Sequence, residues 1–192
     1  MGIVKENLIE AQGFLKALIE NEQKLNLIEQ AGRMISDCFE RQGHVYSCGN
    51  GGSMCDAMHF AEELSGRFRD DRKALGATAI SDGAYITCAG NDFGFDQVFS
   101  RYLEGHGRED DVLLAISTSG KSPNVINAAA KAQQIGMHVI SLTGREDSPL
   151  KNHSTIEICT PCGRYADRVQ ELHIKIIHSL IQLVEANLFK GG

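Results

Sequence analysis

A glycine-rich loop followed by a histidine and a glutamate has the residue types to bind an anion and move a proton. Residues 45–48 are apolar and β-prone, and the GNGGS loop at 49–53 lets the backbone turn tightly and approach a ligand closely. Ser53 is the predicted N-cap of a following helix, whose free N–H groups and dipole favour an anion. His59 and Glu63, four residues apart, share one face of that helix. An ordinary turn and a helix with two solvated side chains would give the same pattern.

A second candidate anion site follows the apolar run DVLLAIS at residues 111–117, which is typical of a buried parallel strand. The TSGKSPN loop at 118–124 supplies hydroxyl groups, a glycine, and a proline suited to the first turn of a helix over 124–135. Hydroxyl and free N–H groups at a helix start form a phosphate nest. Routine capping by a serine is the alternative, and the loop composition favours phosphate.

The elements that must position these loops alternate between strands and helices. Two helices are expected over residues 3–42 with a break or bend near 21–23, one continuous helix being the alternative, and a long amphipathic helix is expected over 165–189. A Gly/Asp/Asn-rich loop is expected over 81–96, followed by a helix over 97–104 with Asp96 as its N-cap. Strands are predicted at 45–48, 77–80, 111–117, 139–143 and 155–160.

This pattern predicts an α/β fold with a mainly parallel five-stranded sheet flanked by helices, with long helices at both ends of the chain. Ligands in such folds bind beyond the carboxyl ends of the strands, and both loops follow strands directly. One domain is expected over residues 1–192, with N-terminal helices at 1–42, an α/β core at 43–164 and a C-terminal helix at 165–192.

Composition limits the classes of function. The net charge of −6 argues against a nucleic-acid partner, which would need a basic face. No secretory signal pattern and no apolar run of about 20 residues is present, so no membrane association and a cytoplasmic location are expected. The six cysteines are expected to be free thiols. Cys159 and Cys162 form a single CxxC, which favours incidental thiols over a zinc or redox motif.

Five segments together resemble the bacterial phosphoheptose isomerases, the sedoheptulose 7-phosphate isomerases of the sugar-isomerase (SIS) domain superfamily. The segments are SCGNGGS at 47–53, DAMHFAEEL at 56–64, GND at 90–92, ISTSGKS at 116–122 and YADRVQE at 165–171. The five segments span nearly the whole chain and occur in the same order as in that family. The TSGKSPN loop at 118–124, the serine loop, would alone indicate only a SIS domain. Its combination with His59, Glu63, Gln170 and His178 is more specific.

The resemblance implies a flavodoxin-like SIS fold and a homotetramer. It implies conversion of sedoheptulose 7-phosphate to D-glycero-D-manno-heptose 7-phosphate, the first step of ADP-heptose synthesis for lipopolysaccharide. One zinc per site is implied at His59, Glu63, Gln170 and His178. Substrate contacts carry over to Asn50, Gly51, Gly52, Ser53, Glu63, Asn91, Asp92, Ser117, Thr118, Ser119, Ser122 and Gln170.

The chemistry of these residue types suits an isomerase. Moving a proton between adjacent carbons through an enediol needs a base, a partner acid and stabilisation of an oxyanion. Glu63 is the expected base and His178 the partner acid/base, since imidazole titrates near neutral pH. Gln170 and His178 would lie about 12 Å apart along one continuous helix, although zinc bonds are only about 2 Å long. We therefore expect one ligand to cross a subunit interface.

Two other readings of the same residues remain open. A non-catalytic SIS protein that senses sugar phosphates or binds a protein would keep the loops but would not need Glu63 and His178. An isomerase of hexose or pentose phosphates would show similar loops, because the loops do not fix the length of the sugar.

Overall fold

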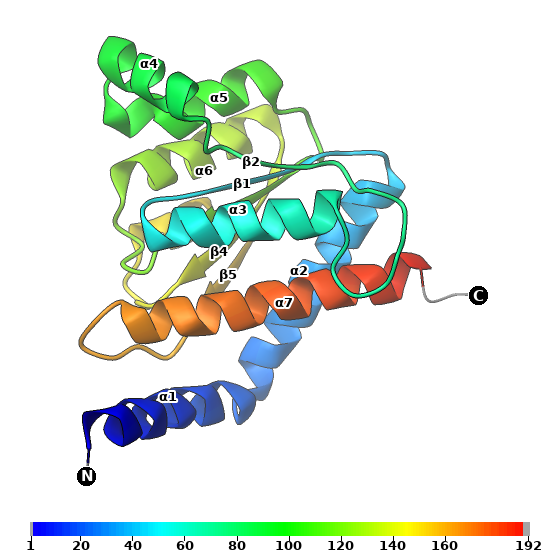
Figure 1. The fold of residues 1–192 in the computed structure, drawn as a ribbon. Coiled ribbons are helices and arrows are strands. Elements are labelled where there is room, and N and C mark those ends of the chain that lie inside the picture. Colours follow the sequence, from blue (N-terminus) through cyan, green and yellow to red (C-terminus); the bar gives the residue numbers. More distant parts are fainter. Residues whose placement is uncertain (1, 190–192) are drawn as a thin grey trace.

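The computed structural model describes residues 2–189, and its centre is a five-stranded parallel sheet with the strand order β2-β1-β3-β4-β5 (Figure 1). Each neighbouring pair of strands is parallel. The prediction of a parallel five-stranded sheet is confirmed. The strands are β1 (Val45–Gly49), β2 (Ala77–Ala79), β3 (Val112–Ile116), β4 (His138–Thr143) and β5 (Ile156–Cys159).

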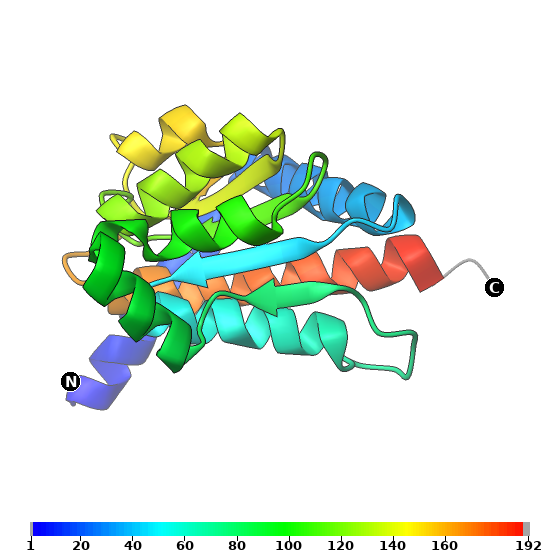
Figure 2. The same cartoon turned by 90° about the horizontal axis from the view of Figure 1, so that it is seen from above.

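Two layers of helices bury the two faces of the sheet (Figure 2). Alternate residues of β3 point to opposite faces, so Leu114 joins one core and Leu113 the other. One layer contains α1 (Ile3–Ile19), α2 (Glu22–Glu40), α3 (Gly52–Ser65) and α7 (Asp167–Phe189). The other contains α4 (Gly83–Phe93), α5 (Val98–His106) and α6 (Pro123–Ile135). Short 3₁₀ turns lie at Phe95–Gln97 and Pro149–His153.

The two N-terminal helices separate where the sequence indicates. Asn21 is the N-cap of α2, and its side chain accepts a hydrogen bond from the Lys24 N–H. Within α1 only Leu18 is buried, while Ile3 and Leu8 are largely exposed. This exposed apolar face is suited to packing against another subunit.

The expectation of a loop over 81–96 is wrong, because most of this segment is helix α4. Asp82 is its N-cap and accepts a hydrogen bond from the Tyr85 N–H at 2.7 Å, which offsets the low helix propensity of the glycines that follow. Asp96 is not an N-cap either. It lies in the 3₁₀ turn before α5, whose N-cap residue, Gln97, makes no side-chain capping hydrogen bond.

The first turn of α3 also differs from the expectation. The N-cap is Gly51 rather than Ser53, and α3 begins at Gly52. Gly51 has a φ of 55°, a left-handed conformation that glycine adopts without strain, so the chain enters the helix earlier than a serine cap would allow. Ser53 is buried inside the first turn. The last helix begins at Asp167, two residues after the predicted start. None of the described helices is long and apolar enough to cross a membrane.

Helices α3 and α7 run side by side in the same direction, and Arg72 joins their far ends (Figure 1). The Arg72 guanidinium lies 2.9 Å from Glu185 of α7, with the two side chains only 4% and 11% exposed. It also donates to the backbone carbonyls of Leu64 and Glu63 at the end of α3. Arg72 therefore satisfies C-terminal carbonyls of α3 and fixes that helix against α7.

Replacement of Arg72 with alanine should lower the free energy of unfolding by about 3–5 kcal/mol, because it leaves a buried Glu185 carboxylate unpaired. Denaturant unfolding measures this change. The matched control is Arg101→Ala, which breaks an ion pair with Glu104 whose side chains are 50% and 52% exposed. That control should cost less than about 1 kcal/mol. Equal losses in the two variants would contradict the structural role of Arg72.

Candidate active site

The two loops singled out in the sequence meet at one edge of the sheet. Strands β1 and β3 are parallel neighbours, so the loops that follow them lie side by side. The side-chain amides of Asn50 and Asn124 donate to each other's oxygens at 2.8 Å and tie the first loop to the start of α6. The expectation that both loops face the same side is confirmed.

The serine loop between β3 and α6 is held in a compact turn. The hydroxyl groups of Ser117 and Ser122 lie 3.1 Å apart, and Ser122 is the N-cap residue of α6. Gly120 has a φ of 63°, and a Cβ there would lie 2.0 Å from the hydroxyl oxygen of Ser148, so only glycine fits. Thr118 is half-buried and Ser119 is exposed. Hydroxyl groups beside a helix N-terminus are suited to an anion.

A cavity of about 180 Å³ opens beside this loop, and its lining carries two arginines that sequence reasoning did not single out. Thr118 and Ser119 line it together with Arg145 and Arg164. One feature of the sequence could have pointed to them: Arg145 and Arg164 each follow a predicted strand, and ligands in such folds bind beyond the carboxyl ends of the strands. The two guanidinium groups give an otherwise acidic chain positive charge next to the hydroxyl groups.

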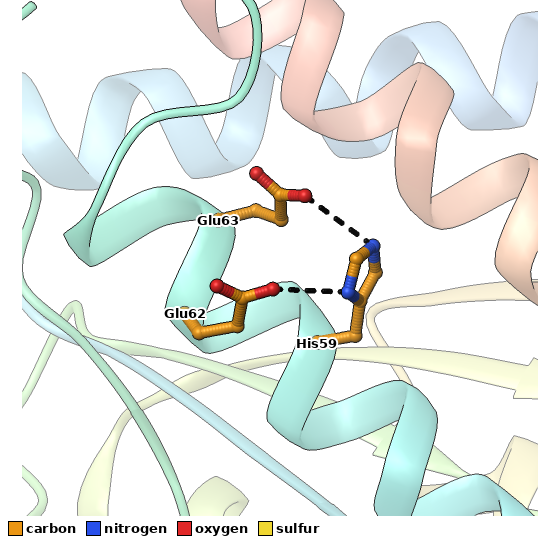
Figure 3. A group of neighbouring side chains, drawn as sticks. All are labelled: His59, Glu62 and Glu63. Carbon is orange, nitrogen blue, oxygen red and sulfur yellow. Dashed lines mark ion pairs between the residues drawn. The ribbon is translucent and has the colours of Figure 1, made fainter.

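His59 is the centre of a cluster of ionisable side chains. Its α3 members, His59, Glu62 and Glu63, are drawn in Figure 3, and His178 of α7 completes it. The Nε2 of His59 lies 3.0 Å from Nε2 of His178 and 3.6 Å from the Oε1 of Glu63. Its Nδ1 lies 3.0 Å from the Oε1 of Glu62. The structure thus brings His59, Glu63 and His178 together within one chain, and it adds Glu62.

Gln170 of α7 packs against α3 at a different level from the His59 cluster. It shares the continuous helix α7 with His178, yet its side chain lies against Gly52, where a Cβ would be 2.7 Å from the Gln170 Nε2. Gly52 precedes His59 by seven residues, about 10 Å along the helix axis. The structure therefore does not bring Gln170 of the same chain to the His59 cluster.

Asn91 and Asp92 occupy the last turn of α4, and both are exposed. Asn91 donates to one oxygen of Asp92 at 2.8 Å, and the Cys88 thiol lies 3.7 Å from the other oxygen. These side chains are held by one another, and their predicted contact with substrate stays a prediction.

The donor set of the His59 cluster fits zinc. Imidazole and carboxylate groups are its usual ligands, and two ligands of a tetrahedral zinc with bonds of about 2 Å lie roughly 3.3 Å apart. The separations of 3.0 Å to His178 and 3.6 Å to Glu63 are close to that value. Burial lowers the pKa of His178, and the nearby His59 lowers it further, so the neutral form that binds a metal is favoured.

The cysteines and His173 are not part of the His59 cluster. All six cysteines are free, as expected, and burial raises the pKa of the Cys159 thiol. His173 is fully buried, and its Nε2 lies 3.2 Å from the Thr143 carbonyl oxygen, so this nitrogen donates. Its Nδ1 has no hydrogen-bond partner, and burial lowers its pKa to about 4.

Comparisons with known proteins define the class first: residues 9–144 match the SIS domain family. The chain is 54% identical over 187 residues to the phosphoheptose isomerase of Histophilus somni (strain 2336), covering 97% of this chain and 96% of that protein. Phosphoheptose isomerase from Neisseria gonorrhoeae has a similar structure, with a TM-score of 0.86 and 36% identity over 94% of this chain and 97% of that chain. The phosphoheptose isomerase structure from Francisella tularensis has a TM-score of 0.85 and 34% identity, over 96% of this chain and 98% of that chain.

The chain therefore belongs to the phosphoheptose isomerase family of SIS-domain proteins. The resemblance read from the five sequence segments is confirmed.

His173 should make the folded state less stable in acid. Its folded pKa of about 4 lies below the ordinary value of 6.5, so the unfolded chain binds the proton more readily. The associated stability is complete above pH 6.5 and is lost as pH falls through 4, by about 3 kcal/mol in total. Unfolding of the metal-free protein between pH 7 and 4 should be less pH-dependent in His173→Leu than in wild type. The exposed control His106→Gln should retain the wild-type slope, and an unchanged slope in His173→Leu would contradict the assignment.

Proposed function

We propose that this protein is an aldose–ketose isomerase that converts sedoheptulose 7-phosphate to D-glycero-D-manno-heptose 7-phosphate. The observation that carries the proposal is the convergence of His59, Glu63 and His178 on the helices next to two anion-binding loops. Curated relatives that are about half identical over nearly the full chain are phosphoheptose isomerases. In this proposal the product enters ADP-heptose synthesis for lipopolysaccharide in the cytoplasm.

The phosphate group of the substrate binds at the serine loop. Hydroxyl groups of Ser117, Thr118, Ser119 and Ser122 and the N-terminus of α6 provide donors there. Arg145 and Arg164 line the adjoining cavity and attract the dianion. The remaining sugar contacts are assigned to Asn50, Gly51, Gly52, Ser53, Asn91, Asp92 and Gln170.

Proton transfer is assigned to Glu63 and His178. The Glu63 carboxylate removes a proton from C1 of the ketose, and the C2 carbonyl oxygen gains a proton from His178, which gives the 1,2-enediol. Glu63 then returns the proton to C2 while His178 takes the proton of the C1 hydroxyl, which gives the aldehyde and restores both groups to their starting states. No atom is gained or lost overall. Both groups lie beside the same nitrogen, Nε2 of His59, so one bound sugar carbon can be near both.

Zinc is proposed at His59, Glu63 and His178, with Gln170 as a further ligand. When bound, zinc polarises the carbonyl and hydroxyl oxygens of the sugar and stabilises negative charge on them. Because Gln170 of the same chain lies against Gly52, the fourth ligand is supplied by a neighbouring subunit. The exposed apolar face of α1 provides a surface for the corresponding homotetramer.

A non-catalytic sugar-phosphate sensor is the weaker alternative. Binding alone requires the loops, whereas the ionisable cluster of His59, Glu63 and His178 costs desolvation without adding to phosphate affinity. The presence of that cluster favours the enzyme.

Replacement of Glu63 with glutamine should lower kcat for sedoheptulose 7-phosphate by about 10²- to 10⁴-fold, because the amide cannot accept the proton from carbon. A coupled assay with and without chelator measures this, and wild-type activity should be lost with chelator and return with zinc. Glu29→Gln is the control, since this exposed side chain on α2 pairs with Arg33 and lies on a different helix from the cluster.

Wild-type rates in Glu63→Gln would remove Glu63 from its role. Tight binding of sugar phosphates by a wild-type protein that isomerises none of them would replace the enzyme with the sensor. Assays with fructose and ribulose phosphates in parallel determine the length of the sugar chain.

A further inference from the structure

The imidazole of His59 has a different partner at each nitrogen. Nε2 faces His178 and Glu63, which are proposed to bind the metal with it. Nδ1 lies 3.0 Å from the Oε1 of Glu62, a residue with no role in the site described so far (Figure 3). Glu62 and Glu63 are adjacent in α3 and leave the helix about 100° apart, so they approach the ring from two sides.

The contact with Glu62 determines which nitrogen of His59 carries the proton. An ionised carboxylate only accepts hydrogen bonds, so Nδ1 must be the protonated nitrogen of a neutral ring. The lone pair is then on Nε2 and points toward His178 and Glu63. Metal-binding histidines typically donate their second N–H to a carboxylate in this way, which fixes the tautomer and the ring orientation.

We propose that Glu62 is a positioning residue that holds His59 in the tautomer and orientation needed to bind zinc through Nε2. The inference rests on the proposed zinc site. Glu62 is not itself a ligand in this arrangement, because its carboxylate contacts Nδ1 and the two ring nitrogens point away from each other. Glu62 therefore acts on the metal only through His59.

An ion pair without functional consequence is the competing explanation, since the Glu62 side chain is 64% exposed. Exposed pairs contribute little to stability, so such a pair would leave zinc affinity unchanged. Loss of a carboxylate that orients a metal-binding histidine instead weakens metal affinity about 10- to 100-fold.

The experiment measures zinc affinity of the full-length protein by competition with a chromophoric chelator. Glu62→Ala should weaken zinc binding about 10- to 100-fold at unchanged stoichiometry. Glu62→Gln should lie between Ala and wild type, because its amide oxygen still accepts from Nδ1. The control is Glu104→Gln, which removes an exposed carboxylate from the same i,i+3 relation to a basic residue and should bind zinc as wild type does.

A second readout reports the tautomer directly. In ¹⁵N spectra of the metal-free protein, His59 should be the Nδ1–H tautomer in wild type and a mixture of tautomers in Glu62→Ala. This measurement does not depend on whether zinc is the physiological metal.

Wild-type zinc affinity in Glu62→Ala would overturn the inference. Loss of zinc stoichiometry would also overturn it, because Glu62 would then be a ligand. Equal weakening in Glu62→Gln and Glu62→Ala would replace positioning with a simple effect of charge. Failure of the wild-type protein to bind zinc would refute the proposed metal site instead. The tautomer measurement alone would then decide whether Glu62 fixes the tautomer of His59.

Discussion

The packing of α3 along α7 is the constraint on which the site depends. The two helices run in the same direction, so residues at matching depths face each other: Gln170 lies against Gly52, and His178 meets His59. Arg72 fixes the far end through Glu185 and the last carbonyls of α3. A shift of either helix by one turn, about 5.4 Å, would separate the two imidazoles.

The parallel sheet positions the other part of the candidate site, the two loops that follow β1 and β3. Because β1 and β3 are neighbours, both candidate anion-binding loops emerge at one edge, and α3 leads from the first loop to the ionisable cluster. A chain with a net charge of −6 can still bind a phosphate there, since helix N-termini, hydroxyl groups and two local arginines act over short distances. In the proposed function, the fold thus separates the phosphate end of the sugar from the end where protons move.

Sequence patterns predicted the features that depend on periodicity and missed those that depend on side-chain direction. Continuous apolar runs located the buried strands, and the spacing of Gln170 and His178 on one helix anticipated that they would not meet within a chain. Helix α4 was missed because its glycines and polar residues are typical of loops, although the Asp82 cap starts a helix. Glu62 was missed because i+3 and i+4 positions both reach His59, and only the orientation of the ring shows that each nitrogen has its own carboxylate.

The central claim is that a complete site takes residues from two chains, and mixed oligomers test it most directly. Glu63→Gln and Gln170→Ala proteins, each inactive alone, would be co-expressed with different tags so that hybrid oligomers can be purified. If Gln170 reaches the cluster from a neighbouring subunit, roughly a quarter of the sites in random hybrids contain both native residues, and activity returns accordingly. Hybrids as inactive as their parents would place all the ligands in one chain and contradict the account.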